Sequence, residues 1–372
     1  MLAHATKLCA LMLSALLVPL AQAVAELNPK VESAIDAIGK EVITSGKSAG
    51  LVIAVAEQGR PVFIRGYGQA SLEWQVPMST DAVFRIGSIT KQFAAAAILL
   101  LSEQGKLSID DKLAKFFPDF PRASEVSVRQ LLNHTSGIHN YPGDSERIIV
   151  RTGMAVPELV EHLGTLGYDF DPGTSWSYSN SGYFLIGAII EQVSGQSFRD
   201  FARQRLFDPL GMPDTAVDVD TEVARHRATG YSSDPASKSA FRNADFTDMS
   251  VPHAAGAIRS TAEDLIKWTA ALHGGRVLNP VSYKEMTTAV NVPGAKEQPR
   301  YGMGLHTEPL LGHPAFRHGG SIDGFEARLA YLVNTRTTLV ILANTEGGAR
   351  DLDEAVVKAL WQSSGKGSAI KQ

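Results

Sequence analysis

The stretch from Phe93 to Leu101 constrains the fold more than any other part of the chain, because it is apolar on every side of a helix. It reads FAAAAILLL, lies in a helix predicted over Ser88 to Gln104, and is followed by Gly105, which suits a helix end. A helix that is apolar nearly all round must be covered by other elements on all of its faces. The chain must therefore build a layered domain around this helix.

Strand patterns flank this helical middle on both sides. Before it, a helical pattern over residues 31–43 precedes two apolar runs, Leu51–Ala56 and Val62–Tyr67, whose separation predicts a β-hairpin. After it, three further strands and a closing helix are predicted; these are Tyr301–Thr307, Phe325–Asn334, Thr337–Ala343 and Asp351–Gln362. We expect an α/β fold of the α+β type: an antiparallel sheet built from both ends, flanked by helices, with an all-helical subdomain inserted.

The predicted subdomains follow from this order. The sheet part covers residues 24–80 and 255–362, the helical part covers residues 81–254, and residues 363–372 form a polar tail. Five more helices are predicted; they are Val126–Leu132, Val156–Leu163, Ser181–Val193, Phe198–Leu206 and Ala262–Leu272.

The first 23 residues have the pattern of a secretory signal. Lys7 precedes an apolar stretch, Leu8–Leu20, that is too short to span a membrane, and Ala21-Gln22-Ala23 fits a cleavage site. We expect an exported protein, periplasmic or secreted, cleaved near Ala23, with an uncleaved anchor as the alternative. No later apolar segment reaches spanning length, so the mature chain is expected to have no integral membrane segment.

Composition excludes several functions. The net charge of −4 does not favour binding to the phosphates of nucleic acid. Cys9, in the signal, is the only cysteine, so the mature chain has no disulfide and relies on a large core. No metal, P-loop or dinucleotide motif is present, so we expect no metal and no cofactor. The expected partner is a small-molecule or peptide substrate, and the oligomeric state is left open.

Ser88 and Lys91 form an S-x-x-K pair at the start of the buried helix. Residues three apart on a helix lie on the same face, which brings the amine within reach of the hydroxyl. A serine needs a base to become a nucleophile, and a lysine whose pKa is lowered by burial supplies one. The pattern recurs at Ser363–Lys366 and Ser368–Lys371, where nothing buries the lysine. The helical context therefore favours Ser88.

A rival nucleophile is Ser48, in the G-x-S-x-G match Gly46-Lys47-Ser48-Ala49-Gly50. A nucleophile elbow requires a strand before the serine and a helix after it. Here the predicted order is reversed, so we exclude an elbow.

Tyr178-Ser179-Asn180 is the only Y-x-N in the chain and precedes a predicted helix. A phenol beside a lysine relays protons between serine, lysine and leaving group. The amide of Asn180 offers a partner for a substrate carbonyl.

His318-Gly319-Gly320 precedes a predicted strand. Two glycines at a strand edge let a ligand approach the backbone closely. The same H-x-G pattern at His162 and His273 lies in helical sequence and is read as structural.

In this order the three motifs resemble those of the class C β-lactamase and penicillin-binding-protein family of serine hydrolases. The spacings of about 90 and about 140 residues are similar, and the likeness runs from Asn28 to Val356. Three flanking segments are also similar; they are Phe84–Ser88, Leu131–Gly137 and Gly256–Thr261.

The resemblance implies a role for each position. Ser88 would be the acylated nucleophile, Lys91 its base or proton relay, and Tyr178 the second proton-transfer group. Asn180 would hold the substrate amide. The implied fold is an antiparallel sheet flanked by helices, with the site beside an all-helical subdomain.

The strand motif completes the implied site. His318 would occupy the strand position that faces the site, with Gly319 and Gly320 also at the substrate. The backbone N–H groups of Ser88 and Ser321 would form the oxyanion hole.

The third motif departs from the family. β-Lactamases usually carry Lys-Thr-Gly or Lys-Ser-Gly there, whereas His318 is charged only part of the time near neutral pH and Gly319 has no hydroxyl. Arg317 and Arg328 are candidates to replace the cation. Relatives with histidine resemble D-aminopeptidases, D-alanyl-D-alanine carboxypeptidases or esterases. We expect a hydrolase of ester or D-amino-acid peptide bonds; the alternatives are a non-hydrolytic protein that binds cell-wall peptides and a weak β-lactamase.

Overall fold

The computed structural model describes residues 27–143 and 147–362. The predicted signal and the polar tail, with its two further S-x-x-K matches, lie outside the described residues. Within these two ranges, no helix is long and apolar enough to cross a bilayer.

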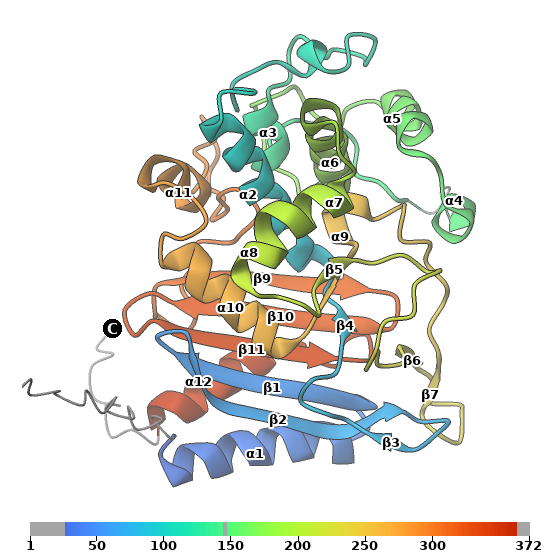
Figure 1. The fold of residues 1–372 in the computed structure, drawn as a ribbon, viewed down its shortest axis with the longest axis vertical. Helices are drawn as coiled ribbons and strands as arrows, with labels where there is room; N and C mark the ends of the chain where they lie inside the picture. Colours follow the sequence, from blue (N-terminus) through green and yellow to red (C-terminus); the bar gives the residue numbers. More distant parts are fainter. Residues whose placement is uncertain (1–26, 144–146, 363–372) are drawn as a thin grey trace, which may run out of the picture.

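One six-stranded antiparallel sheet joins the two ends of the chain, in the order β3-β2-β1-β11-β10-β9 (Figure 1). The N-terminal hairpin is β1 and β2, and the last three strands form a meander whose third member, β11, pairs with β1. The strands are β1 (Gly50–Glu57), β2 (Arg60–Ser71), β3 (Val76–Pro77), β9 (Ala315–Ile322), β10 (Phe325–Leu332) and β11 (Thr337–Ala343). The expected antiparallel sheet from both ends is confirmed.

One strand prediction is wrong. Tyr301–Thr307 is a tight turn closed by an isolated bridge between Tyr301 and His306. Strand β9 was implied for His318 by the family resemblance, but the hydrophobic pattern did not predict it. Gly304 has a φ of +75° and lies so close to Lys91 that a Cβ would come within 2.5 Å of the Lys91 carbonyl oxygen. The two glycines of β9 hid its strand pattern, because glycine is uncommon in strand interiors.

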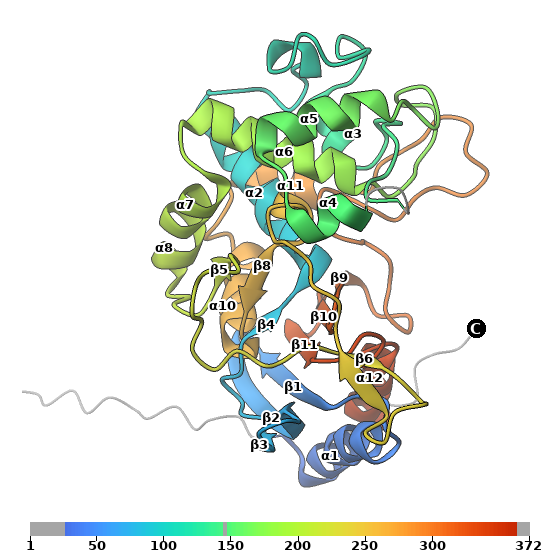
Figure 2. The same ribbon diagram turned by 90° about the vertical axis from the view of Figure 1, so that its right-hand side faces the viewer.

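Helices cover both faces of the sheet (Figures 1 and 2). Helices α1 (Pro29–Thr44) and α12 (Leu352–Gln362) pack on one face, over Leu51, Ile53 and Val55. Helix α10 (Ala262–His273) lies on the other face, where Val52, Ala54 and Leu342 belong to the larger core. Successive side chains of β1 point to opposite faces of the sheet, and helices cover both faces, so β1 is buried on both sides.

The apolar helix predicted at the outset is α2 (Thr90–Glu103), and it is buried from Thr90 to Leu99. It packs against α6 (Asn180–Ser194), α9 (His253–Gly256) and α11 (Pro280–Thr287). A short 3₁₀ turn, η1 (Gly87–Ile89), precedes it and contacts β9.

The remaining helices surround this bundle next to β9 (Figure 1). They are α3 (Val128–Leu132), α4 (Arg147–Thr152), α5 (Val156–Thr165), α7 (Phe198–Ala202) and α8 (Asp208–Leu210), with shorter turns at Leu113–Lys115 and Arg203–Phe207. Two small sheets connect them to the large sheet; their strands are β4 (Phe84–Arg85), β5 (Ala216–Val217), β8 (Ile258–Ser260), β6 (Tyr231–Ser233) and β7 (Phe241–Asn243).

Ser48 lies between α1 and β1, and its hydroxyl donates to the Gly50 carbonyl 2.8 Å away. The order is helix, serine, strand, so the exclusion of a nucleophile elbow is confirmed.

Candidate active site

Ser88 lies in η1, between the end of β4 and the first turn of α2, and it lines a cavity. The backbone N–H groups at this helix start are directed toward incoming ligands. Gly87, with a φ of +49°, lets the turn touch β9, because a Cβ there would lie 2.8 Å from the Ser321 backbone nitrogen. Ser88 and Ser321 therefore meet at the cavity, as an oxyanion hole requires.

Lys91 lies one turn further along, fully buried, with three acceptor atoms around its amine. Nζ lies 3.1 Å from Ser88 Oγ, 2.8 Å from Asn180 Oδ1 and 2.8 Å from the Ala255 carbonyl oxygen. Desolvation lowers the pKa of Lys91 well below its ordinary value. A neutral amine has two N–H donors and one lone pair, which matches two carbonyl acceptors and one serine hydroxyl.

Tyr178 stands just before α6, where the Ser179 side chain caps the helix by accepting the Gly182 N–H. Its ring lies 4.7 Å from Lys91 Nζ. Its hydroxyl is buried and has no hydrogen-bond partner among the described residues. Burial raises the pKa of Tyr178, and the nearby Ser88 hydroxyl offsets part of that rise. The phenol is therefore protonated at neutral pH and lies next to the Ser88 hydroxyl.

Asn180 begins α6 and turns its side-chain oxygen toward Lys91, as given above. Its backbone N–H donates to Asn140 Oδ1 at 2.7 Å, which fixes the helix start. The structure thus brings Asn180 to the cavity, with its carbonyl oxygen already engaged by Lys91.

His134 is a residue that sequence reasoning missed. Its ring packs 4.4 Å from the Tyr178 ring, and its Nδ1 accepts the Ser179 N–H at 3.1 Å. It therefore fixes both the position of Tyr178 and the start of α6. His134 belongs to the segment Leu131–Gly137, whose similarity to the family is the sequence feature that could have identified it.

His318 lies in β9 with its side chain buried against other rings. Its Nε2 is 3.1 Å from the Tyr301 hydroxyl, and its Nδ1 donates to the Gly319 carbonyl at 2.5 Å. Burial lowers the pKa of His318 well below its ordinary value, and His306 and Lys91 lower it further when they are protonated. His318 is therefore neutral, so the expected part-time positive charge is wrong for this structure.

Gly320 faces the same side of β9 as His318 and allows the strand to touch η1. A Cβ at Gly320 would lie 1.9 Å from the Ile86 carbonyl oxygen and 3.1 Å from the Ser88 nitrogen. Gly319 faces the opposite side, where a Cβ would lie 2.2 Å from an Arg328 guanidinium nitrogen.

Neither arginine replaces the missing lysine. Arg317 and Arg328 share the opposite face of the sheet from His318, because side chains alternate along a strand. Arg317 pairs with Glu308 and Asp353, and Arg328 lies 2.6 Å from Glu326.

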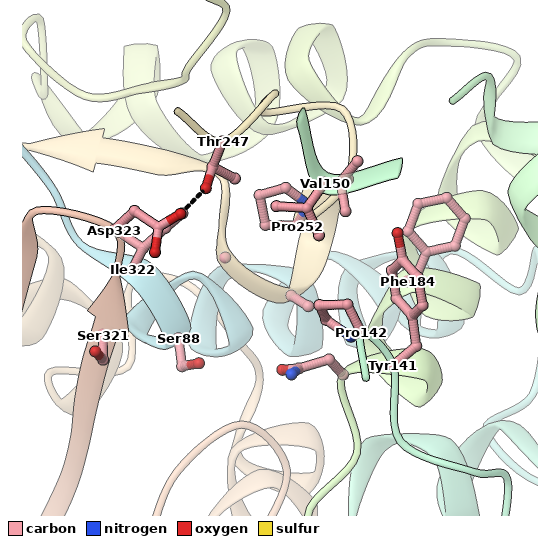
Figure 3. A pocket seen from close by; sticks show the side chains of 14 residues that line it. Ser88, Tyr141, Pro142, Val150, Phe184, Thr247, Pro252, Ser321, Ile322 and Asp323 are labelled. Carbon is pink, nitrogen blue, oxygen red and sulfur yellow. Dashed lines mark hydrogen bonds between the residues drawn. The ribbon is translucent and has the colours of Figure 1, made fainter. Parts of the chain in front are cut away.

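The cavity beside Ser88 has a volume of about 210 Å³ (Figure 3). Its polar part contains Ser88, Asn180, Thr247, Ser321 and Asp323. Its apolar part is formed mainly by rings and aliphatic side chains: Tyr141, Pro142, Val150, Phe184, Val251, Pro252 and Ile322. His318, Gly319 and Gly320, expected at the binding site, do not line this cavity, and neither do Lys91 and Tyr178, which lie behind Ser88 and Asn180.

Comparison with known proteins agrees with this geometry. The family model described as Beta-lactamase matches residues 31–360. A penicillin-binding protein of Bacillus subtilis (strain 168) is 31% identical, over 83% of this chain and 71% of its own length. A D-aminopeptidase of Gluconobacter oxydans (strain 621H) is 25% identical over 83% of this chain, which spans 58% of that enzyme's length.

Solved structures are similar as well. The D-amino acid amidase from Ochrobactrum anthropi SV3, complexed with L-phenylalanine amide, superposes with a TM-score of 0.80. The two proteins share 28% sequence identity, and the match covers 90% of this chain and 99% of the amidase.

An antiparallel sheet flanked by helices, with a serine and a buried lysine at the start of the central helix, defines a serine hydrolase of the penicillin-binding type. The chain belongs to the β-lactamase family.

Proposed function

We propose that this chain is an exported serine hydrolase that cleaves amide or ester bonds of D-amino-acid derivatives through an acyl-enzyme on Ser88. The observation that carries the proposal is the buried Lys91 amine, 3.1 Å from Ser88 Oγ, with its pKa lowered by desolvation. A neutral amine at this distance is a competent general base.

In the first step Ser88 Oγ forms a bond to the substrate carbonyl carbon, and its proton passes to Lys91. The backbone N–H groups of Ser88 and Ser321 stabilise the oxyanion. The bond to the leaving nitrogen or oxygen then breaks. Tyr178 gives its proton to the leaving group and takes the proton held by Lys91. Water then forms a bond to the acyl carbon and gives a proton to Tyr178 or Lys91. The bond between that carbon and Ser88 Oγ breaks, the proton passes to Oγ, and the acid leaves.

The D-amino-acid substrate is proposed from the relatives named above, which include a D-aminopeptidase and a D-amino acid amidase. Efficient penicillin hydrolysis is not proposed, because His318 is neutral and no cation lines the cavity among its described residues. A weak β-lactamase activity is the alternative, and hydrolysis of nitrocefin tests it. D-aminoacyl p-nitroanilides, D-Ala-D-Ala peptides and p-nitrophenyl esters test the proposed amide and ester hydrolysis.

The acyl-enzyme is tested by intact-mass measurement after reaction with a fluorophosphonate probe. The wild-type protein should gain one probe mass and Ser88→Ala none. Equal labelling of the two proteins, or no labelling of either, would show that Ser88 is not the nucleophile. Steady-state turnover of a p-nitrophenyl ester distinguishes hydrolysis from binding of cell-wall peptides.

Export is proposed from the signal pattern in residues 1–23. Mass spectrometry of the protein from a periplasmic extract of a bacterial host should find a new N-terminus near Ala23. A full-length protein that remains in the cytoplasmic fraction would contradict export.

A further inference from the structure

Among the described residues that line the cavity beside Ser88, there is one carboxylate and no cationic side chain. Of the described residues that line it, Asp323 is the one that carries a charge. Such a cavity attracts a cationic group and repels a carboxylate. The cavity therefore favours a substrate with a positive charge, and not a carboxylate, near its scissile bond.

Asp323 follows β9 directly, two residues after Ser321. Asp323 is in the turn, so its Cα lies no further from the Ser321 Cα than the roughly 7 Å that two extended residues span. Asp323 and Ser321 both line the cavity, so Asp323 is within about one amino-acid unit of the residue whose N–H group the proposed mechanism assigns to the oxyanion. That is where the α-substituents of an aminoacyl substrate would lie when its carbonyl is at Ser88.

The turn that carries Asp323 is held by contacts that do not use its carboxylate. The N–H of Gly324 donates to Glu346 Oε1 at 2.9 Å. Gly324 also packs closely on Gly230, because a Cβ at Gly324 would lie 2.7 Å from the Gly230 Cα. The position of Asp323 is therefore preorganised without help from its carboxylate.

The Thr247 hydroxyl donates to Oδ2 of Asp323 and orients it (Figure 3). Figure 3 shows this pair on one side of the cavity, across from Tyr141 and Phe184. Asp323 forms no ion pair within the described part of the chain. Its carboxylate is therefore available to pair with a cationic group of a ligand.

We propose that Asp323 binds the α-ammonium group of the substrate, while the substrate side chain packs against Tyr141 and Phe184. This inference rests on the proposed function, since it names the substrate class for acyl transfer to Ser88. The preferred substrates are then aminoacyl amides and esters with a free α-amino group and an apolar side chain. Peptides recognised through a C-terminal carboxylate are disfavoured.

The test compares D-phenylalanine p-nitroanilide with its N-acetyl derivative, which lacks the ammonium group. In the wild-type protein, kcat/KM should be roughly 10- to 100-fold higher for the free amine, as expected for a hydrogen bond between charged groups. In Asp323→Asn this preference should fall to near one. Asp323→Glu, which keeps the charge, should retain more of the preference than Asp323→Asn.

Asp245→Asn is the matched control, because Asp245 is an exposed carboxylate that pairs with Arg151 and does not line the cavity. It should leave the preference unchanged. Thermal unfolding of each variant checks that the fold is intact, and the wild-type preference tests the inference without any variant.

The results distinguish a wrong role for Asp323 from a wrong proposed function. If Ser88-dependent hydrolysis is observed but the wild-type protein shows no preference, or Asp323→Asn keeps the preference, the role of Asp323 is wrong and the proposed function stands. If neither these substrates nor the esters are hydrolysed in a Ser88-dependent way, the proposed function fails, and this inference fails with it.

Discussion

At the scale of single residues, protonation decides whether this site works. Lys91 is surrounded by acceptors and has no carboxylate among the hydrogen-bond partners of its amine. Burial therefore lowers its pKa without a counter-charge to raise it again. The amine that would be an ordinary surface cation elsewhere is here a base.

The lowered pKa of Lys91 predicts the acid limb of the pH profile. The general base is the neutral form of Lys91, so kcat/KM should fall as pH drops through the lowered pKa of Lys91 and that amine becomes protonated. Lys91→Arg should lose activity by roughly 10²- to 10⁴-fold at every pH, because arginine does not deprotonate. Kinetics from pH 5 to 10 measure both, and an arginine variant with near wild-type activity would refute the role of Lys91 as base.

Tyr178→Phe separates function from stability. The Tyr178 hydroxyl is buried without a partner among the described residues, so its removal should not lower the free energy of unfolding. If the hydroxyl transfers protons, however, kcat should fall by roughly 10²- to 10⁴-fold. Urea unfolding and ester kinetics are the measurements. Tyr283→Phe, on α11, is the control for kinetics, and a Tyr178→Phe variant with wild-type kcat would remove Tyr178 from the mechanism.

At the scale of elements, the site depends on the contact between β9 and η1. Gly320 makes this contact possible, because a Cβ there would meet backbone atoms, which have no room to move. Gly320→Ala should therefore lower the free energy of unfolding by about 1–3 kcal/mol and reduce kcat/KM, as the strand moves away from Ser88.

The neighbouring Gly319→Ala is a matched comparison. Its added Cβ would meet the end of the flexible Arg328 side chain, so the loss of stability should be smaller. Chemical denaturation of the two variants gives the two values. Equal losses would mean that close approach to η1 is not what requires glycine at Gly320.

The elements also show how far sequence patterns extend. The β1–β2 hairpin and helices α2, α6 and α10 were predicted because their apolar periodicity is uninterrupted. Strand β9 was not, because two adjacent glycines removed the side chains that form a strand pattern. The same glycines are what let β9 approach Ser88, so the feature that builds the site concealed the element.

At the scale of the whole molecule, buried ion pairs join segments that are far apart in sequence. The Asp218 side chain is fully buried between three arginines. Arg85 lies 2.9 Å from it and Arg259 lies 2.8 Å from it, while Arg227 also pairs with it. These contacts link β4, which leads into η1, to β8.

Asp218→Asn should lower the free energy of unfolding by about 3–5 kcal/mol, because it leaves buried guanidinium groups without their counter-charge. The exposed carboxylate variant Asp245→Asn should change it by less than about 0.5 kcal/mol. Urea denaturation compares the two. A small loss for Asp218→Asn would show that Asp220 and Glu222 are sufficient partners for these arginines.

The sequence by itself determined what lies within one helix or one motif. The buried helix, the spacing of Ser88 and Lys91, and the start of α6 at Tyr178 and Asn180 follow from local periodicity and capping, which act over a few residues. Only the tertiary structure decided the charges and directions at the site. It made His318 neutral and turned Arg328 to the opposite face.

It also brought Asp323 into the cavity, more than two hundred residues from Ser88 along the chain. The physical reason is that desolvation and strand orientation depend on what packs around a residue. Those neighbours come from distant parts of the chain, and no local pattern records them.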